Sequence, residues 1–305
     1  MIDTKNPNLT VGIKDTWKKC FLGQDPRWTE YFFQNIYQPS FGYAVVEEDK
    51  VVASLCRIPH AYMFNGRVLQ ASMLSNVAVL ADVKQEEKRN ELMERVLDAC
   101  EHTELITLLA SEQGELFQKY GFEKVYSRNQ YKIERGDITS NQSVLGCVFD
   151  PSPVDMLKVY VGFIRRFTGF YARDLDYFTQ KKKEMSACGG KIVAYYNAKN
   201  RIQGYAIIRI VGKEAYIDEC VYLESTALLR LIHAALQERG TVYLNTSSAE
   251  NLSMLLPNAT CKEVMPIYAR LNDASLFSRL YNRQVTNVKE AFSLHKKPLN
   301  LNEKY

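Results

Sequence analysis

Side chains that can do chemistry are concentrated between Ser75 and Phe122. Lys84, Lys88 and Arg89 place three positive charges beside two glutamates in a polar segment that precedes an amphipathic run. Helix N-termini favour anions, because their unpaired amides and the helix dipole both point outward. The three positive charges would attract an anionic group, and the two glutamates would repel it.

Three further side chains in this stretch can exchange protons or order water. Ser111 and Glu112 follow an apolar run, and Tyr120 comes just before a Gly-Phe pair. A carboxylate can order a water molecule that takes up a proton, and a tyrosine hydroxyl can donate one. Two plainer roles stay open, which are helix capping for Ser111 and aromatic packing for Tyr120.

The elements that must position these residues are a strand, a charged loop, a helix, a strand and a short helix. The helix is indicated by five apolar side chains at 3.6-residue spacing. The expected ranges, in chain order, are Val77–Leu80, Lys84–Arg89, Glu91–Cys100, Leu105–Leu109 and Leu116–Phe122.

This ordered set resembles the core of the GNAT family of N-acetyltransferases. The resemblance rests on Val77-Ala78-Val79, on the basic loop and helix, and on the ending Phe117-Gln118-Lys119-Tyr120-Gly121-Phe122. Ala110-Ser111-Glu112, with Ile58-Pro59 and Asn65-Gly66 upstream, is similar to the enhanced-intracellular-survival (Eis-type) branch. The resemblance extends over roughly residues 10 to 280.

The resemblance implies an α+β protein with tandem GNAT-like acyltransferase folds, in which mixed central sheets are flanked by helices. The order of predicted elements in the second half repeats that of the first. There, the turn Glu224-Ser225-Thr226 is too short to cradle a phosphate and indicates a degenerate copy that serves as a scaffold. The expected segments are 1–136 for the N-terminal domain, a linker near 136–145, 145–272 for the second domain, and 273–305 for a short helix and tail.

At the C-terminal end, Asn272 to Asn282 resembles the first helix of the sterol-carrier-like third domain of Eis-type proteins, which is expected to be truncated here. In that family the terminal carboxylate reaches the active site. This role is not carried over to Tyr305.

The resemblance further implies acetyl-CoA as co-substrate. Two positions depart from the family pattern: Glu87 stands where a glycine is usual, and Phe117 stands where a proton-donating tyrosine is usual. Tyr120, one helical turn further on, is the expected substitute as the catalytic acid. The expected cofactor-binding residues are Val77, Ala78, Val79, Lys84, Gln85, Glu86, Glu87, Lys88, Arg89, Asn90, Ser111 and Glu112.

The helix expected over residues 26–37 is dense in aromatic side chains and starts at Asp25-Pro26, a good capping signal. Trp28 and Tyr31 are the candidates for binding the acceptor substrate, as the resemblance implies for this position. The alternative is plain packing of the aromatic residues against a sheet, although one sheet cannot bury aromatic side chains on every face of a helix.

Two functions from different classes follow. The first is an acetyl-CoA-dependent N-acetyltransferase with a degenerate cofactor loop, acting on a small-molecule or peptide amine of unknown identity. The second is a catalytically silent GNAT-like protein that binds a ligand or partner.

The seven cysteines and four histidines are dispersed, so no metal site is expected. Interspersed charges argue against nucleic acid, and no apolar run is long enough for a membrane span. A cytoplasmic protein, alone or as a homo-oligomer, is expected.

Overall fold

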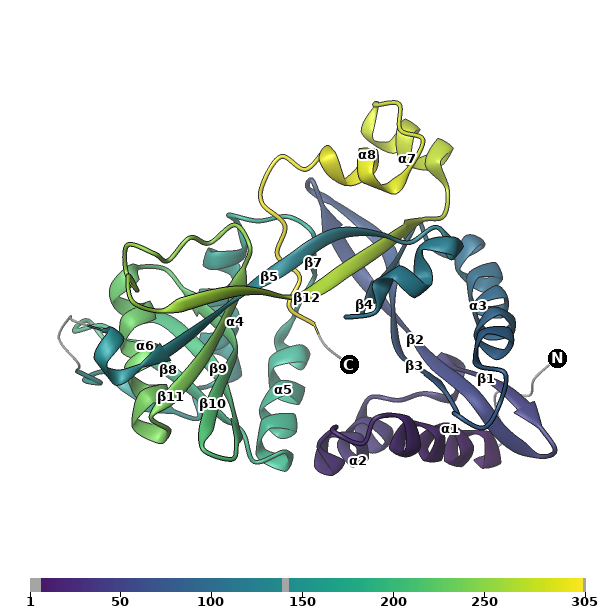
Figure 1. Cartoon of the computed structure of the whole chain (residues 1–305). Coiled ribbons are helices and arrows are strands. Elements are labelled where there is room, and N and C mark those ends of the chain that lie inside the picture. Colours follow the sequence, from purple (N-terminus) through teal and green to yellow (C-terminus); the bar gives the residue numbers. More distant parts are fainter. Residues whose placement is uncertain (1–6, 139–142, 304–305) are drawn as a thin grey trace. The chain divides into compact units, whose positions relative to one another are not determined.

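The computed structural model describes residues 7–138 and 143–303. They form two compact units (Figure 1). Unit 1 takes the chain up to Val125, then Pro266–Leu294 and the residues from Glu303 onward; unit 2 comprises Tyr126–Met265 and His295–Asn302. Part of the expected linker, and Tyr305, lie outside the described residues.

The elements that begin in unit 1 are α1 (Pro7–Cys20), α2 (Pro26–Asn35), η1 (Pro39–Phe41), β1 (Gly42–Glu47), β2 (Lys50–Phe64), β3 (Arg67–Val79), α3 (Gln85–Glu101), β4 (Ile106–Ala110), η2 (Gly114–Tyr120), β5 (Glu123–Glu134), α7 (Ala274–Tyr281) and α8 (Val288–Ser293). Those that begin in unit 2 are η3 (Arg135–Asp137), β6 (Cys147–Phe149), α4 (Pro153–Ile164), β7 (Phe170–Tyr171), α5 (Leu175–Ala187), β8 (Lys191–Tyr196), β9 (Ile202–Val211), β10 (Glu214–Tyr222), α6 (Ser225–Glu238), β11 (Thr241–Ser247) and β12 (Thr260–Leu271).

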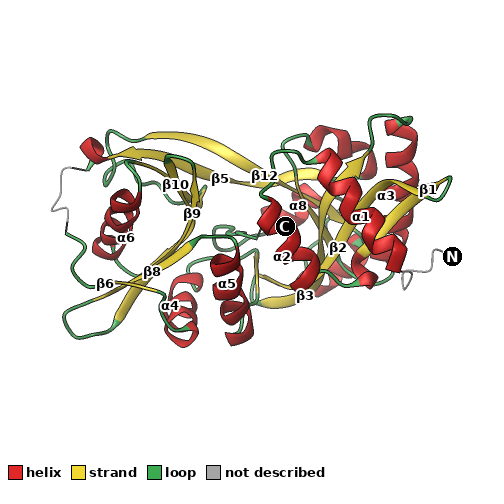
Figure 2. Cartoon of the chain, turned by 90° about the horizontal axis from the view of Figure 1, so that it is seen from below, coloured by secondary structure: helices red, strands yellow, loops and turns green. Residues whose placement is uncertain are grey.

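The sheet of unit 1 has the strand order β1-β2-β3-β4-β12. All neighbouring strands are antiparallel except β3 and β4, which run parallel and are connected through α3. Helices cover both faces (Figure 2). Trp17 and Phe32 of α1 and α2 pack on one face, and Leu92 and Val96 of α3 pack on the other. This arrangement confirms the α+β class.

Two long strands, β2 and β3, flank the Asn65-Gly66 turn. β2 continues through Pro59, which pairs with Ser72, so this proline does not end the strand. At the turn, Asn65 and Gly66 have φ of 47° and 81°, the left-handed pair that a two-residue hairpin requires.

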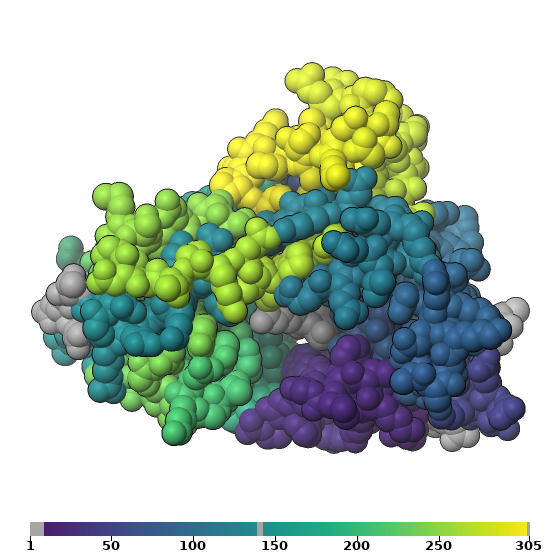
Figure 3. All heavy atoms as spheres, viewed as in Figure 1, coloured from purple at the N-terminus to yellow at the C-terminus, as the bar shows by residue number. Residues whose placement is uncertain are grey.

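The segment expected to hold one short helix and a tail contains α7 and α8, drawn in yellow and yellow-green at the surface of unit 1 (Figure 3). Both helices pack on the tip of the β2–β3 hairpin. Phe277 and Phe292 lie with ring centroids 6.1 and 5.4 Å from that of Phe64, and the Tyr281 hydroxyl donates to the Phe64 carbonyl at 2.9 Å. Aromatic burial therefore fixes this segment to unit 1.

Unit 2 repeats the plan, with strand order β5-β11-β10-β9-β8-β6. β10 and β11 are parallel and connected through α6, as β3 and β4 are through α3. β5 belongs to unit 2 from Tyr126 onward and pairs with β11 over Arg128–Glu134. β12 belongs to unit 1 from Pro266 onward and pairs with β4 over Ile267–Leu271. Each half of the sequence thus supplies a strand to the sheet of the other unit, which the expected ranges 1–136 and 145–272 did not anticipate.

A buried ion pair fixes the centre of unit 2. Arg173 donates to both carboxylate oxygens of Glu219, at 2.8 and 2.9 Å, and the hydroxyl of Tyr205 donates to the same carboxylate at 2.5 Å. Burial alone would raise the pKa of Glu219, but the charge of Arg173 and these hydrogen bonds outweigh it and lower the pKa to about 2.

We expect unit 2 to lose stability in acid because of this carboxylate. A carboxylate with a lowered pKa stabilises the fold above its unfolded pKa, and this contribution is lost as the pH falls from about 4.5 toward about 2. Glu219→Gln should therefore lower stability at pH 7 and flatten its loss in acid, as measured by urea unfolding followed by circular dichroism. Glu238→Gln, at an exposed ion pair, is the control. An unchanged acid profile in Glu219→Gln would contradict this assignment.

Among the described helices, none is both long and apolar enough to cross a membrane.

Candidate functional site

The two parallel strands of unit 1 separate at their carboxyl ends. β3 and β4 are paired from Ala71–Ile106 to Leu74–Leu109. Beyond that point β3 continues to Val79, whereas β4 ends at Ala110. Ligands of open sheets with parallel strands commonly bind outside the carboxyl ends of those strands. The opening between β3 and β4 is therefore the candidate site.

A β-bulge bends β3 at this opening. Ser75 pairs with Cys56 and Ala78 with Ser54, so that Asn76 and Val77 stand opposite a single residue of β2. Asn76 has a φ of 52°, a left-handed conformation that asparagine tolerates better than most residues. An extra residue of this kind increases the local bend and twist and re-aims the side chains that follow.

Unpartnered polar atoms flank the bulge. The side-chain amide nitrogen of Asn76 is buried and has no hydrogen-bond partner among the described residues, and the same holds for the Ser54 hydroxyl across the bulge. A buried donor without an acceptor costs about 1–3 kcal/mol, so such a group calls for an explanation. Asn76 and Ser54 are therefore the polar groups at the bulge that the described residues leave unsatisfied.

Sequence reasoning selected the neighbours of Asn76 but not Asn76 itself. Val77, Ala78 and Val79 do lie at the opening, and their side chains pack into the cores on the two faces of the sheet. An asparagine next to an apolar Val-Ala-Val run was the available signal, because asparagine is depleted in strands and enriched at positive φ.

The charged loop expected at Lys84–Arg89 is for the most part helix. α3 begins at Gln85, so only residues 80–84 separate it from β3. Lys84 is the N-cap residue and provides no side-chain cap, which leaves the first amides of the helix without an intrahelical acceptor. The expected anion site therefore persists as a helix N-terminus, but not as a loop that wraps a phosphate.

The basic residues near this helix start are largely neutralised by carboxylates. Lys88, whose side chain is 12% exposed, contacts Glu47 at 2.5 Å and has Glu91 at 3.6 Å; its contact with Glu47 raises the pKa of Lys88. Lys84 lies 3.5 Å from Glu87, and Lys119 holds Glu86 at 2.7 Å. The expectation that Lys88 attracts a phosphate is weakened accordingly.

Tyr120 and Asn90 are brought together by the fold. The Tyr120 hydroxyl donates to Asn90 Oδ1 at 2.5 Å, and burial raises the pKa of Tyr120. A tyrosine with a raised pKa keeps its proton at neutral pH, as an acid must. Phe117 is a buried core residue that packs against Phe122. Its phenyl ring has no proton to donate, so it cannot act as the acid.

Tyr120 also borders a hollow of about 690 Å³ on the outer side of α3. Its lining includes Glu94, Glu101 and Arg270, and most of its charges are already engaged in ion pairs, such as that of Arg270 with Glu101. The hollow lies beside α7 and α8 in unit 1, and the bulge at Asn76 is not among its lining residues.

The remaining predicted residues take plainer positions. Ser111 Oγ accepts a hydrogen bond from the backbone amide of Gln113 at 3.1 Å. This bond closes a turn ahead of η2 and does not cap the helix. Glu112 is exposed. Trp28 is half-buried and Tyr31 is buried; their rings stack with centroids 6.4 Å apart on α2. Asp25 caps α2 as expected.

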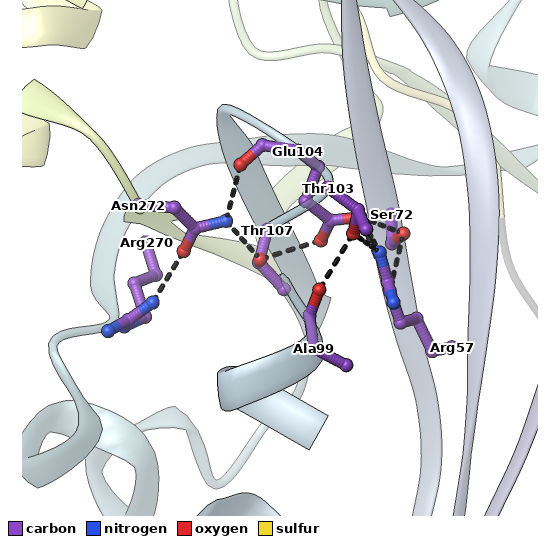
Figure 4. Close-up of polar contacts among 8 residues, drawn as sticks. All are labelled: Arg57, Ser72, Ala99, Thr103, Glu104, Thr107, Arg270 and Asn272. Atoms are coloured by element: carbon purple, nitrogen blue, oxygen red, sulfur yellow. Dashed lines mark hydrogen bonds and ion pairs between the residues drawn. The ribbon is translucent and has the colours of Figure 1, made fainter. Parts of the chain in front are cut away.

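A second polar cluster lies at the opposite end of β4 (Figure 4). The carboxylate of Glu104 accepts hydrogen bonds from Arg57 at 2.8 Å, from Thr107 at 2.8 Å and from Ser72. Asn272 of the residues after β12 donates to Thr107 Oγ1 at 2.9 Å. Both carboxylate oxygens are satisfied by the protein, so this cluster ties β2, β3 and β4 together and offers no free group for catalysis.

Comparisons with known proteins agree with this fold. Residues 4–125 match the family model described as an acetyltransferase (GNAT) domain. No curated protein is similar enough in sequence to count as a relative.

Solved structures match over both units. A GCN5-related N-acetyltransferase from Anabaena variabilis superimposes with a TM-score of 0.71 at 17% identity, covering 88% of this chain and 71% of that one. Eis1 from Mycobacterium abscessus gives 0.63 at 13% identity, covering 88% and 72%. A tandem GNAT protein from the clavulanic acid biosynthesis pathway gives 0.58 at 10% identity, covering 89% and 97%. Residues 4–125 are therefore similar to a GNAT acetyltransferase domain, and the fold of the chain is similar to that of Eis1 and of tandem GNAT proteins.

Proposed function

We propose that this protein is an acetyl-CoA-dependent N-acetyltransferase that acts on an amine, with its one active site in unit 1. The observation that carries the proposal is the opening between β3 and β4, where a bulge holds the buried amide nitrogen of Asn76, for which the described residues offer no acceptor. A GNAT fold and this unused donor together support acyl transfer at the opening.

The residues of unit 1 fit three tasks in such a reaction. The first amides of α3 suit the pyrophosphate of acetyl-CoA. Asn76 suits the thioester carbonyl, whose oxygen becomes negative when the amine attacks, because a donor placed at the developing charge lowers the barrier. Tyr120 suits the leaving thiolate, to which it would transfer its proton after releasing Asn90.

The neutral amine forms a bond to the acetyl carbon, the carbon–sulfur bond breaks, and the thiolate receives a proton. The amine loses one proton to water ordered at the site. Trp28 and Tyr31 are proposed to contact the acceptor, whose identity, whether small molecule or peptide, is left to experiment.

Release of free thiol in the presence of acetyl-CoA and candidate amines tests this function. A panel of diamines, amino acids and lysine-containing peptides should include at least one that accelerates thiol release, with the acetylated product confirmed by mass spectrometry. If the protein binds acetyl-CoA but no amine accelerates release, the proposal of catalysis is wrong.

The second candidate is a catalytically silent ligand- or partner-binding protein. Two observations favour it: Phe117 is buried where a tyrosine is usual, and Glu86 and Glu87 occupy the first turn of α3, where an anion would approach. In this case acetyl-CoA should bind weakly or not at all.

We predict that removing the carboxylate of Glu87 tightens acetyl-CoA binding by at least about tenfold. Its side chain is 59% exposed in the first turn of α3, and its loss also leaves Lys84 without its partner carboxylate. Glu87→Gly tests the residue usual in the family, and Glu87→Ala avoids the helix penalty of glycine. Both are to be measured by calorimetric titration.

Glu94→Ala, two turns further along α3, is the matched control and should bind like the wild type. Equal affinities for Glu87→Ala and the wild type would show that phosphate does not sit at this helix start.

A further inference from the structure

Tyr120 is the last residue of η2 and is followed by a glycine in the left-handed conformation. Gly121 has a φ of 84° and ends the helix. Glycine adopts many backbone conformations, so the residue beside it needs further contacts to keep one position. The Tyr120 hydroxyl has such a contact with Asn90 Oδ1 at 2.5 Å. In the proposed reaction this contact breaks, because the hydroxyl must leave Asn90 to reach the thiolate. A second contact is therefore needed to hold Tyr120 at that moment.

A half-buried arginine provides a contact with the backbone of Tyr120. Arg270 of β12 donates from Nε to the Tyr120 carbonyl at 3.0 Å. Its side chain is 18% exposed and lies against Gly121, with Nε, Cγ and Cδ 3.6–3.9 Å from the place where a Cβ would stand. The last carbonyls of a helix have no intrahelical donor, and arginine side chains can bond to them. Arg270 thus fixes the peptide unit that joins Tyr120 to Gly121.

Arg270 is itself held at both of its terminal nitrogens. Nη1 donates to Asn272 Oδ1 at 2.5 Å, and Nη2 is paired with the carboxylate of Glu101, the last residue of α3. Asn272 donates in turn to Thr107 of β4, so the network continues into the Glu104 cluster (Figure 4). With all three of its nitrogens engaged, the planar guanidinium is held in one orientation.

We propose that Arg270 is a positioning residue for acyl transfer, which keeps the backbone of Tyr120 fixed while the hydroxyl moves from Asn90 to the thiolate. Arg270 itself neither gives nor receives the proton. It lies 150 positions after Tyr120, on the strand that the second half of the sequence supplies to unit 1. The second half therefore completes the site that the first half begins. The positioning role rests on the proposed function, whereas the contact between the two residues does not.

Steady-state kinetics of Arg270→Ala with the best amine tests the positioning role. We expect kcat to fall by at least about tenfold while KM for acetyl-CoA and for the amine stays the same, because a misplacement of about 1 Å can cost about 10²-fold in rate. Arg95→Ala is the matched control, since Arg95 also donates to a carbonyl, that of Ala44 in β1 at 3.3 Å, and also pairs with a carboxylate. It should keep the wild-type kcat. An unchanged kcat in Arg270→Ala, or a change in KM alone, would overturn the proposal.

Methylguanidinium should restore part of the kcat that Arg270→Ala loses. Arg270 lines the hollow of about 690 Å³ beside α3, so a small cation can reach the place that the shortened side chain vacates. Methylammonium carries the same charge without the planar fork and should not restore kcat. Rescue by neither cation, or equal rescue by both, would overturn the role of the guanidinium.

If Arg270→Ala does not fold, Arg270→Lys replaces it in the kinetics, because a single ammonium cannot hold the Tyr120 carbonyl, Glu101 and Asn272 together. Hydrogen exchange read by mass spectrometry on the full chain then separates the contact from the reaction. Peptides covering 117–122 should exchange faster in the Arg270 variant than in the wild type or in Arg95→Ala. Unchanged exchange would overturn the contact. Faster exchange in a protein that acetylates no amine would reject the proposed function, and with it the positioning role, but would keep the contact.

Discussion

Replacing Asn76 by aspartate should lower kcat for amine acetylation about a hundredfold. Removing one donor from an oxyanion site typically costs about 10²–10³ in kcat. Aspartate keeps the shape of asparagine and tolerates the φ of 52° at this position, so the bulge should persist while the donor is lost. Steady-state kinetics with acetyl-CoA and the best amine would give kcat and KM separately.

Asn200→Asp is the matched control, because Asn200 is also left-handed, with a φ of 54°, but lies in the β8–β9 turn of unit 2. It should show wild-type kinetics. If Asn76→Asp changes KM alone, or changes nothing, then Asn76 does not stabilise the transition state and its buried amide needs another explanation.

Replacing Glu104 by alanine should destabilise unit 1 by about 3–5 kcal/mol. Breaking a buried ion pair on one side leaves the other charge uncompensated, and this costs more than the pair contributes. Arg57, whose side chain is 15% exposed, would lose its carboxylate, and Ser72 and Thr107 would lose their acceptor (Figure 4). Urea unfolding at neutral pH measures the change.

Glu101→Ala is the control for a half-exposed ion pair, where the loss should stay within about 1 kcal/mol. A double variant, Arg57→Met with Glu104→Met, should recover part of the stability lost in Glu104→Ala, because it removes both charges. A loss below about 1 kcal/mol in Glu104→Ala would mean that the cluster is not a structural tie.

The sequence was informative where local rules dominate. Asp25-Pro26 marks the start of α2, and Asn65-Gly66 marks the hairpin, because capping and left-handed turns depend on a few adjacent residues. Apolar periodicity located the core of α3 and the strand β4 for the same reason.

Predictions that depend on distant partners were less complete. The run Lys84–Arg89 looked like a loop, because its charges mask helix periodicity; it is helical, and its lysines are paired with carboxylates such as Glu47 and Glu87. No local pattern reveals that β5 pairs with β11 and β12 with β4, because strand pairing is decided by tertiary packing.

The sequence located part of the candidate site. Val77, Ala78 and Val79 were located by their place in a family pattern, and they lie at the opening. Asn76 was not found, because its position becomes apparent only once the separation of the two strands is known. The signal is geometric: a bulge, and a buried polar group placed at it.

Calorimetric titration of the wild-type protein with acetyl-CoA, at low and at high salt, tests the central claim most directly. We expect weak binding at one site per chain, with an affinity that falls as salt rises, because the start of α3, Lys84 and Arg89 would supply much of the attraction. The absence of binding at either salt concentration would contradict an acetyl-CoA site between β3 and β4 and would favour the silent, partner-binding alternative.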